Sequence, residues 1–498
     1  MTSSEGSGGM SNAALWTQAG KVTPYVLALD EGTTNAKAFA VAPDGSILSS
    51  GSAPVAVSYP RPGWVEQDAE AVWAAQCAAI RECLDGVEGV PAGITISNQR
   101  ESVVAWDPAT GEALAPMLGW QDSRTAEFCD WLRSPEREFA VAATTGLSLD
   151  PMFSAPKMRY LLDRVGSGPV RIGTVDSWLM GRLTGQAAYV IEAGNASRTL
   201  LLDLATLDWS PAMCELFGVD RSGLPDVVPS NADFGTTTGL DFLPDGVPIV
   251  GVLGDSHAAL FGHGCRTTAE GKATYGTGSS VMIPSGADRS IRTGVSTTLA
   301  WLTDAPMYGH EGNIVASGTA MDWAARLLGV KPGRELDELA ATVPDSGGVS
   351  LVPAFTGLGA PWWDRQAVGI ISGLTAGTSR GHVARAALEA VAHQIADVVE
   401  ALDTSDLQVL HADGGATASR LLMQTQADLL GRDVVVSANA EVSALGAALM
   451  GFTRLGWELP ATSQQEGRHY RPALDNDARA AARDQWRGAL ARSRATPA

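Results

Sequence analysis

Three short turns rich in glycine and threonine constrain this chain more than any other feature, because each one directly follows an apolar run. They are DEGTTNAK at residues 30–37, TYGTGSS at 274–280 and DGGATAS at 413–419. Such turns offer backbone N–H groups and hydroxyls to an anion, and their glycines let a ligand approach bare backbone. Each turn alone is equally typical of an ordinary hairpin, and none completes a P-loop or a dinucleotide fingerprint. Together they indicate a phosphate or nucleotide site assembled from distant segments.

Strand and helix patterns alternate around these turns. The apolar runs at residues 25–30 and 37–42 predict strands of an antiparallel meander. Apolar side chains at three- and four-residue spacing predict helices over 68–84 and 380–402. This mixture indicates an α/β core. Both halves of the chain contain a strand, a glycine turn and a second strand, so we expect two similar halves that meet near residues 262–270.

The charge balance excludes several classes of partner. The 498 residues include 35 Lys and Arg against 55 Asp and Glu, a net charge of −20. A nucleic-acid binder needs a basic face, and so does a protein held on an anionic membrane. We therefore expect neither partner, whereas a small polyanionic ligand remains compatible with a few local donors.

Cysteine usage and hydropathy indicate the compartment. The five cysteines are scattered and none has CxxC spacing, which suits a reducing cytosol. No apolar run reaches the roughly 18 residues of a membrane span. Residues 1–20 lack the basic and apolar regions of a signal peptide and resemble a loose Ser/Gly tail. We expect a soluble cytoplasmic protein of about three domains by length, or two large ones, with homo-oligomerisation left open.

The segment GDSHAALFGHG offers several chemistries. Asp255 follows an apolar run and is a candidate general base at a strand end. Ser256 is a candidate nucleophile, although Ala258 stands where a nucleophile elbow requires glycine. His257 and His263 are candidate metal ligands that lack a third ligand at a typical spacing. The plain alternative is that Asp255 caps a helix.

Two further segments suit a polyhydroxylated ligand. GITISN at residues 93–98 and VVAWD at 103–107 predict a hairpin, and Arg100 and Glu101 lie between them. A buried polyol needs such paired donors and acceptors, since each unpaired polar group costs about 1–3 kcal/mol. Trp120, in WQDSR, adds an aromatic face that suits the C–H face of a sugar, or that belongs to the core.

Taken in order from about residue 25 to residue 455, these segments resemble the FGGY carbohydrate kinases, and among them the glycerol kinases. The segments that carry the resemblance are LALDEGTTNAK, YPRPGWVEQD, NQRE, WQDSR, TGLSLDP, GTVDSWL, NASRTLL, LDW, GDSHAALFG, TYGTGS, VPAFTGLGAPWWD, DGGATAS and SALGAA. The resemblance implies two actin-like, ribonuclease-H-like domains of α/β class with a cleft between them. It implies ATP-dependent phosphorylation of a small polyol or sugar, with ATP and Mg²⁺. The implied division is a tail at 1–21, a polyol- and phosphate-binding domain at 22–264 and a nucleotide-binding domain at 265–498.

The resemblance also implies roles for individual residues. Asp255 corresponds to the catalytic base. The positions that contact the polyol are Arg100, Glu101, Trp120, Met152, Asp255, Ser256 and Ser280. The positions that contact ATP are Thr33, Thr34, Lys37, Thr277, Gly318, Asp322, Gly415 and Ser419. Asp30 and Asp255 correspond to the carboxylates around Mg²⁺, which they hold through water.

Three substrate positions depart from the glycerol kinases. Met152 replaces a tyrosine, Ser256 replaces a glutamine and Ser280 replaces an aromatic residue. These changes predict a larger and more polar site, and so a four- or five-carbon polyol or ketose as substrate. Asp322 and Ser419 also replace amides near the nucleotide. The alternatives are glycerol kinase proper, a non-catalytic actin-like nucleotide-binding protein and a Ser256 hydrolase.

Overall fold

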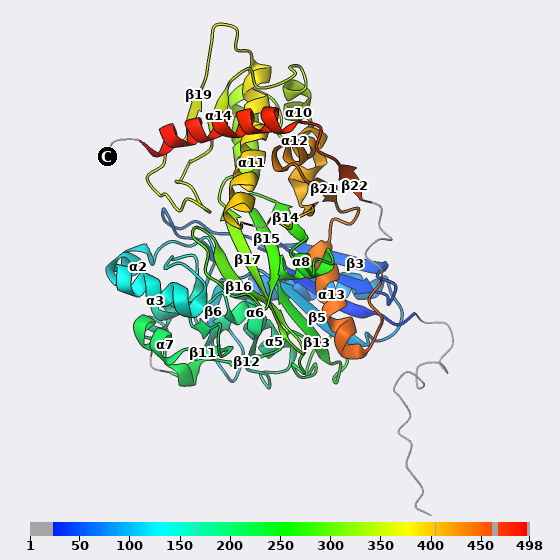
Figure 1. Cartoon of the computed structure of the whole chain (residues 1–498). Helices are drawn as coiled ribbons and strands as arrows, with labels where there is room; N and C mark the ends of the chain where they lie inside the picture. Colours follow the sequence, from blue (N-terminus) through cyan, green and yellow to red (C-terminus); the bar gives the residue numbers. More distant parts are fainter. Residues whose placement is uncertain (1–22, 167, 404, 461–466, 496–498) are drawn as a thin grey trace, which may run out of the picture.

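The computed structural model describes residues 23–166, 168–403, 405–460 and 467–495. They form two bodies, one above the other in Figure 1: the first half of the chain builds the lower body, and most of the second half builds the upper body. The predicted tail at 1–21 lies outside the described residues. Among the residues that are described, we find no helix with the length and hydropathy that a membrane crossing requires.

The lower body is built on a five-stranded sheet in which β1, β2 and β3 form the predicted meander. Its strands, in spatial order, are β13 (Ile249–Gly254), β5 (Gly93–Asn98), β1 (Val26–Glu31), β2 (Asn35–Val41) and β3 (Ile47–Pro54). β5 and β13 run parallel to β1. The carboxyl ends of the three parallel strands therefore share one edge of the sheet. That edge brings together Asp30, the residues that follow Asn98, and Asp255.

The predicted hairpin between residues 93–98 and 103–107 is wrong, because the two strands belong to different sheets. Glu101 has a left-handed backbone (φ 62°), which turns the chain out of the first sheet after β5. The second sheet consists of β4 (Glu66–Gln67), β7 (Met117–Leu118), β6 (Val103–Trp106) and β8 (Arg171–Thr174). Every residue of β5 and β6 is buried. The turn thus places Arg100 and Glu101 between two buried sheets, where a hairpin would have put them at a surface loop.

Helices cover both sheets of the lower body. The predicted helix at 68–84 is confirmed as α1, and the Asp68 side chain caps it by accepting from the N–H groups of Glu70 and Ala71. The helices here are α1 (Ala69–Asp85), α2 (Ala126–Leu132), α3 (Pro135–Thr145), α4 (Ser154–Leu162), α5 (Val175–Leu183), α6 (Ala193–Ala196), α7 (Pro211–Phe217) and α8 (Asp255–Gly262). Small two-stranded sheets join β9 (Val190–Glu192) to β12 (Asp226–Val228) and β10 (Leu202–Asp203) to β11 (Asp208–Trp209).

A seven-stranded sheet organises the upper body. Its strands, in spatial order, are β16 (Ser296–Leu302), β17 (Pro306–Ile314), β15 (Ser279–Gly286), β14 (Glu270–Tyr275), β20 (Val409–Asp413), β21 (Asp433–Val436) and β22 (Arg468–Tyr470). Its helices are α9 (Gly318–Leu328), α10 (Arg334–Ala340), α11 (Arg380–Ala401), α12 (Arg420–Leu430) and α14 (Asn476–Arg494), beside the hairpin of β18 (Ser350–Val352) and β19 (Ile370–Ser372). The predicted helix at 380–402 is confirmed as α11.

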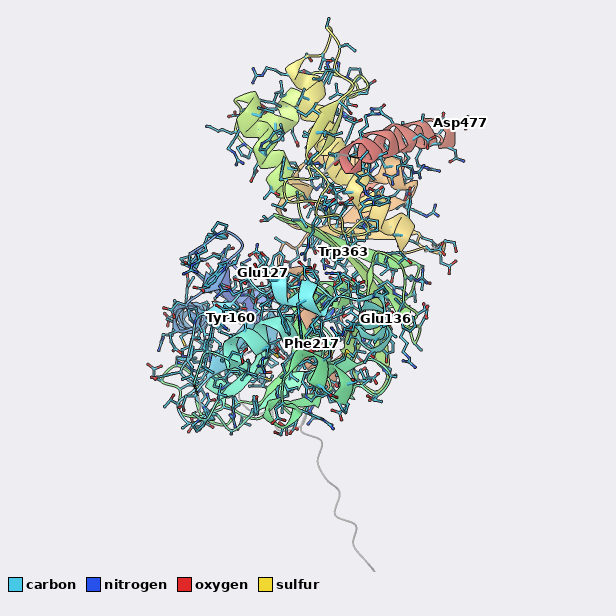
Figure 2. The ribbon with its side chains drawn as sticks, turned by 90° about the vertical axis from the view of Figure 1, so that its left-hand side faces the viewer. Glu127, Glu136, Tyr160, Phe217, Trp363 and Asp477 are labelled. Carbon is cyan, nitrogen blue, oxygen red and sulfur yellow. The ribbon has the colours of Figure 1, made fainter. Side chains whose placement is uncertain are left out.

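The two bodies are interwoven where they meet. α13 (Val442–Leu455) comes late in the chain but packs on α8 and on β13, β5 and β1 of the lower body. Leu299 and Tyr308, on β16 and β17, join a core cluster of the lower body. Figure 2 shows the junction from the side, with Trp363 at the level where the bodies meet. Residues from both halves of the sequence therefore surround the edge where Asp30 and Asp255 lie.

Candidate active site

Asp255 is the first residue of α8 and comes directly after β13. Arg100 follows the neighbouring strand β5, and its Nε lies 3.2 Å from Asp255 Oδ1. Gly254 makes this approach possible, because a Cβ there would lie 2.5 Å from Arg100 Cγ. The Asp255 side chain keeps 45% of its surface exposed, whereas Arg100 keeps only 6%. Arg100, a predicted substrate residue, therefore lies mostly inside the fold, and Asp255, the predicted base, is the more exposed of the two.

A buried network of two arginines and two glutamates lies behind Asp255. Arg100 donates two hydrogen bonds to Glu311 of β17, at 3.1 and 2.6 Å. Arg198 lies 3.1 Å from the same carboxylate and donates to Glu101 at 2.6 Å. Burying such charges is tolerable only when they are paired this closely. The network unites residues from both bodies and fixes Arg100 and Glu101 in place.

The electrostatics separate the two carboxylates that contact Arg100. Burial alone would raise the pKa of Glu311, but the guanidinium groups of Arg100 and Arg198 outweigh burial and hold that pKa well below its usual range. Loss of solvation raises the pKa of Asp255, Arg100 opposes the rise and Glu101 adds to it. Glu311 is therefore a permanent anion, and Asp255 is a carboxylate with increased proton affinity. An increased proton affinity is what a general base needs.

The predicted substrate residues Ser256 and Ser280 contact each other beside Asp255. Ser256 Oγ donates to Ser280 Oγ at 3.2 Å, and Ser280 Oγ donates to Glu311 Oε1 at 2.8 Å. Lys272 of β14 is fully buried and donates to both serine hydroxyls, at 3.0 and 3.2 Å. Met152 is partly buried and packs against a lower-body core cluster.

The first glycine and threonine turn meets the predicted substrate site through Trp120. The indole Nε1 of Trp120 donates to Thr33 Oγ1 at 3.1 Å, although 87 positions separate the two residues. Thr34 is exposed at the same turn. Lys37 is held by Glu441, with 2.6 Å between Nζ and Oε2. The predicted polyol and phosphate contacts therefore adjoin, and Lys37 has a carboxylate partner where sequence reasoning expected only phosphate.

In the upper body the TYGTGSS turn packs against the start of α9. Gly318 N donates to Gly276 O at 3.0 Å, and a Cβ on Gly318 would lie 2.6 Å from that oxygen, so the two loops pack backbone on backbone. Thr277 is exposed beside them. Asp322 is exposed one turn further along α9. The N–H groups of Gly276, Gly318 and Thr319 already donate to backbone oxygens, so this arrangement leaves the exposed Thr277 beside tightly packed glycines.

In the DGGATAS turn, Gly414 and Ser419 have structural roles, whereas Gly415 is exposed at the surface. Gly414 has φ +92°, and a Cβ there would lie 2.5 Å from Tyr275 O. Gly415 is exposed, with nothing within 4 Å of a Cβ. Ser419 caps α12 by accepting from Leu422 N at 3.1 Å, so its hydroxyl already has a structural role. Gly415 is therefore the residue of this turn with free space for a ligand.

Asp30 and Asp255 fit a hydrated divalent cation. Burial raises the pKa of Asp30 to about 6, with Lys37 opposing and Asp255 contributing to the rise. A cation held by both carboxylates would offset the effect of Asp255 on Asp30, and hard cations such as Mg²⁺ prefer oxygen ligands and retain water. By contrast, no cluster of three or more His, Cys, Asp or Glu with metal-binding geometry occurs among the described residues.

The competing interpretations of the GDSH segment find no support. His257 is buried and contacts Arg100 and Thr298, and burial holds its pKa well below the usual value. His263 bonds Asp413 at 2.7 Å, so the two histidines serve different partners. Ser256 Oγ donates its proton to the Ser280 hydroxyl and accepts from Lys272, so neither hydrogen bond removes the proton as a serine nucleophile requires.

Sequence reasoning missed four residues of this site. Arg198 lay in a segment that carried the resemblance, but it had no role there. Glu311 and Lys272 lie within strands that are mostly buried, but their segments, PMYGHEGNI and EGKATY, are not apolar runs in which a charge would stand out. Glu31 is fully buried, and its Oε1 accepts from Gln99 Nε2 at 2.9 Å. Their partners are distant in sequence, so only the fold reveals the pairing.

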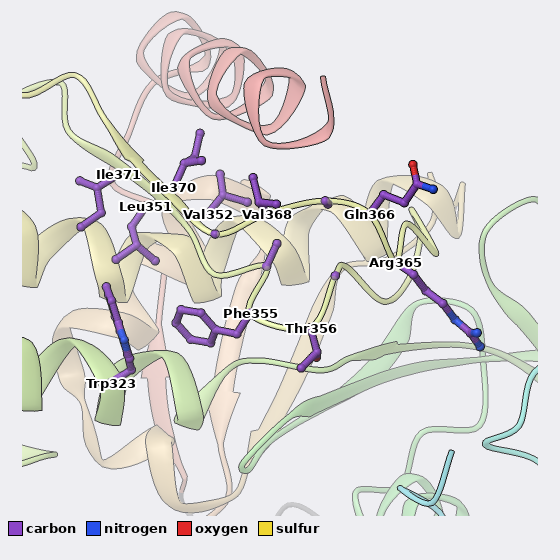
Figure 3. A pocket seen from close by; sticks show the side chains of 14 residues that line it. Trp323, Leu351, Val352, Phe355, Thr356, Arg365, Gln366, Val368, Ile370 and Ile371 are labelled. Atoms are coloured by element: carbon purple, nitrogen blue, oxygen red, sulfur yellow. The ribbon is translucent and has the colours of Figure 1, made fainter. Parts of the chain in front are cut away.

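A cavity of about 550 Å³ lies away from these residues, in the upper body. Figure 3 shows it between Trp323 of α9 and the β18–β19 hairpin, with Phe355 beside Trp323. Most of its lining residues are apolar, and the charged one among them, Arg365, bonds Asp150 at 2.9 Å. Phosphoryl transfer needs charge and donors, so this cavity is not the candidate active site.

Comparison with known proteins decides the family. Residues 25–262 match the N-terminal domain of the FGGY family of carbohydrate kinases, and residues 271–455 match the C-terminal domain. This chain belongs to the FGGY family. The two-domain actin-like, ribonuclease-H-like α/β fold of this FGGY kinase is thereby confirmed.

Individual relatives of this FGGY kinase match it over nearly the full length of both chains. It is 44% identical over 492 residues to the apulose kinase of Pectobacterium atrosepticum, covering 95% of this chain and 99% of that one. It is 42% identical over 481 residues to the glycerol kinase of Citrifermentans bemidjiense, covering 93% and 97%. The crystal structure of Plasmodium falciparum glycerol kinase with ADP superposes with a TM-score of 0.88 at 28% identity, covering 96% and 99%. The chain is an enzyme that phosphorylates a sugar or polyol with ATP.

Proposed function

We propose that this FGGY kinase phosphorylates a four- or five-carbon polyol or ketose in preference to glycerol. The observation that carries this proposal is the pair of small hydroxyl side chains, Ser256 and Ser280, beside Asp255. An aromatic ring at position 280 would fill the space with apolar surface, whereas a serine leaves room and offers hydrogen bonds. Met152, at the position where the glycerol kinases have a tyrosine, would supply a flexible apolar side chain that adapts to a longer carbon chain.

Glycerol is the second candidate substrate. Arg100, Glu101 and Trp120 keep the residue types that the glycerol kinases use, and glycerol kinases 42% identical to this chain are among its relatives. The relative named apulose kinase is 44% identical, which supports a sugar substrate. These identities are too similar to decide between the two, so the local change at Ser256 and Ser280 carries the proposal.

In the proposed mechanism Asp255 accepts the proton of the attacking hydroxyl. Its Oδ1 is oriented by Ser256 N at 2.6 Å, and Arg100 keeps it ionised despite the loss of solvation. Glu101 and Arg100 orient the neighbouring substrate hydroxyls, because their partners Arg198 and Glu311 prevent them from moving. Fixed geometry of this kind supplies most of the catalysis in phosphoryl transfer.

The phosphates are proposed to lie between the turns of the two bodies. Thr33, Thr34 and Lys37 approach from residues 22–264, and Thr277 with its backbone N–H group approaches from residues 265–498. Gly318, Asp322, Gly415 and Ser419 surround the adenosine part of ATP. Mg²⁺, held through water by Asp30 and Asp255, would neutralise charge on the transferred phosphoryl group.

A substrate panel tests the proposal. Steady-state kcat/KM is measured with ATP and Mg²⁺ for glycerol, erythritol, erythrulose, xylulose and ribulose. We expect one of the four- or five-carbon compounds to exceed glycerol by about tenfold, which corresponds to about 1.4 kcal/mol. The variant Ser280→Phe should reverse the order, because the ring occupies the added space. A clear preference of the unchanged enzyme for glycerol would contradict the proposal.

The compartment is part of the same proposal. All five cysteines are free and buried, and burial raises the pKa of thiols such as Cys77 and Cys83 to about 11. Inert thiols suit a reducing cytoplasm. Labelling of the native enzyme with a thiol reagent should be slow for every cysteine.

A further inference from the structure

Lys272 is a buried cation whose hydrogen-bond partners are all neutral. Its Nζ donates to Ser256 Oγ at 3.0 Å, to Thr274 Oγ1 at 3.2 Å and to Ser280 Oγ at 3.2 Å. An ammonium group has three N–H bonds and no acceptor, so these three contacts use it completely. The Lys272 side chain has no exposed surface. It therefore cannot contact a substrate, but it contacts two side chains that can.

The lysine dictates the direction of the hydrogen bonds beyond it. Because Lys272 only donates, both serine oxygens must accept from it. Ser280 sends its own proton to Glu311 Oε1 at 2.8 Å, and Glu311 is a permanent anion that only accepts. Ser256 in turn sends its proton to Ser280 at 3.2 Å. A chain of donors therefore runs from Lys272 through Ser256 and Ser280 to Glu311.

Ser256 and Ser280 differ in the hydrogen-bonding capacity that remains after these contacts. Ser280 accepts from Lys272 and from Ser256 and donates to Glu311, so its hydroxyl is saturated. Ser256 accepts from Lys272 and donates to Ser280, and one lone pair stays free. Ser256 adjoins Asp255, whose carboxylate is 45% exposed, and itself keeps 9% of its surface exposed. The free lone pair is thus an acceptor beside the predicted base.

We propose that Lys272 is a specificity-determining positioning residue, which makes Ser256 a hydrogen-bond acceptor for a substrate hydroxyl. This inference rests on the proposed function and adds the chemistry of recognition: the substrate bears a hydroxyl, which can donate, at the carbon that meets Ser256. A carbonyl at that carbon cannot donate and leaves the lone pair unpaired. Without Lys272, no fixed donor requires Ser256 to accept, so its hydroxyl can present either its proton or a lone pair to the substrate and the discrimination is lost.

The test is a double-mutant cycle on substrate preference. The quantity measured is the ratio of kcat/KM for erythritol, which has a hydroxyl on every carbon, to kcat/KM for erythrulose, which has a carbonyl in place of one of them. We expect Ser256→Ala to change this ratio by about five- to tenfold, as the loss of one hydrogen bond implies. Lys272→Met should change it by a similar factor, and the double variant by no more than either single one. The exposed Lys331→Met is the matched control, with an unchanged ratio.

A merely structural lysine would lower both rates together and leave the ratio intact, which would overturn the proposal. Additive effects of Lys272→Met and Ser256→Ala would overturn it as well. If Lys272→Met does not fold, Ser280→Ala carries the test, because it removes the acceptor of the Ser256 proton without removing the cation. It should change the ratio, and Ser256→Ala should add nothing to it. The preference of the unchanged enzyme tests the proposed function separately, since only the change between variants tests Lys272.

Discussion

The substrate side and the nucleotide side of this kinase are built on different principles. Beside Asp255, four buried charges on Arg100, Arg198, Glu101 and Glu311 hold one another in place. On the nucleotide side, loops meet backbone to backbone at glycines such as Gly318, with few charges. A neutral, variable polyol requires donors and acceptors in fixed positions, whereas ATP brings its own charge and needs close access to the backbone. Replacing a charged side chain should therefore impair the substrate side. Replacing a glycine by alanine, which adds a Cβ to the backbone, should impair the nucleotide side.

Loss of the proposed base should have the largest effect. Asp255→Asn keeps the size and the polarity of the side chain but removes its capacity to accept a proton. We expect kcat to fall by about 10²- to 10⁴-fold, with ATP binding retained in equilibrium titration. Asp68→Asn, another aspartate at a helix N-terminus, is the matched control and should keep full activity. Retained turnover in Asp255→Asn would refute the role of the base.

Breaking the buried charge network should have the next largest effect. Arg198→Met leaves Glu101 and Glu311 each with one partner fewer and should destabilise the fold by about 3–5 kcal/mol, measured by denaturant unfolding. Arg221 pairs with Asp208 at the surface, and Arg221→Met should cost less than about 1 kcal/mol. Equal losses would show that the substrate side does not depend on buried pairing.

Two adjacent glycines probe the nucleotide side. Gly414→Ala forces a side chain onto a left-handed backbone against Tyr275 O and should cost about 1–3 kcal/mol of stability. Gly415→Ala points into open space, so stability should hold while the KM for ATP rises about fivefold, equivalent to about 1 kcal/mol. A stable Gly415→Ala variant with unchanged KM would remove Gly415 from the ATP site.

The pH dependence of stability should reveal Glu31. Burial raises its pKa to about 8 from an ordinary 4.5, with hydrogen bonds from Gln99 opposing. Between these values the unfolded chain releases a proton that the folded chain keeps, so the free energy of unfolding decreases as pH rises from 4.5 to 8. Glu31→Gln should remove that decrease, a gain on the order of 1–3 kcal/mol at pH 8 and none at pH 4.5. Glu88 is exposed, so Glu88→Gln is the control. If the free energy of unfolding depends on pH in the same way in both variants, Glu31 does not cause the decrease.

The smallest expected effect is a shift in the pH dependence of turnover, caused by the raised pKa of Asp255. Loss of solvation raises the pKa of Asp255. When the pH is lowered, kcat/KM should therefore begin to fall at a higher pH than it would with an aspartate of ordinary pKa. Only the ionised carboxylate accepts the hydroxyl proton, so activity increases with pH through this value. An acid limb at the ordinary pKa near 3.9 would contradict the shift.

The sequence by itself determined the family, the α/β class and the segments of the site, because motifs such as DEGTTNAK and GDSH place reactive groups at strand ends wherever the strands pack. Helices α1 and α11 were predictable from local periodicity alone. The path of the chain after β5 was not, because a left-handed residue at Glu101 and pairing with distant strands replaced the hairpin that the local pattern predicted.

Only the tertiary structure decided which charges meet. Arg100 and Glu311 are 211 positions apart, and Lys37 and Glu441 are 404 apart, so no spacing rule connects them. The physical reason is that a buried charge is defined by its partner, and the partner is chosen when two distant strands share a sheet or a junction. The direction of the bonds from Lys272 to Ser256 likewise exists only in the folded site.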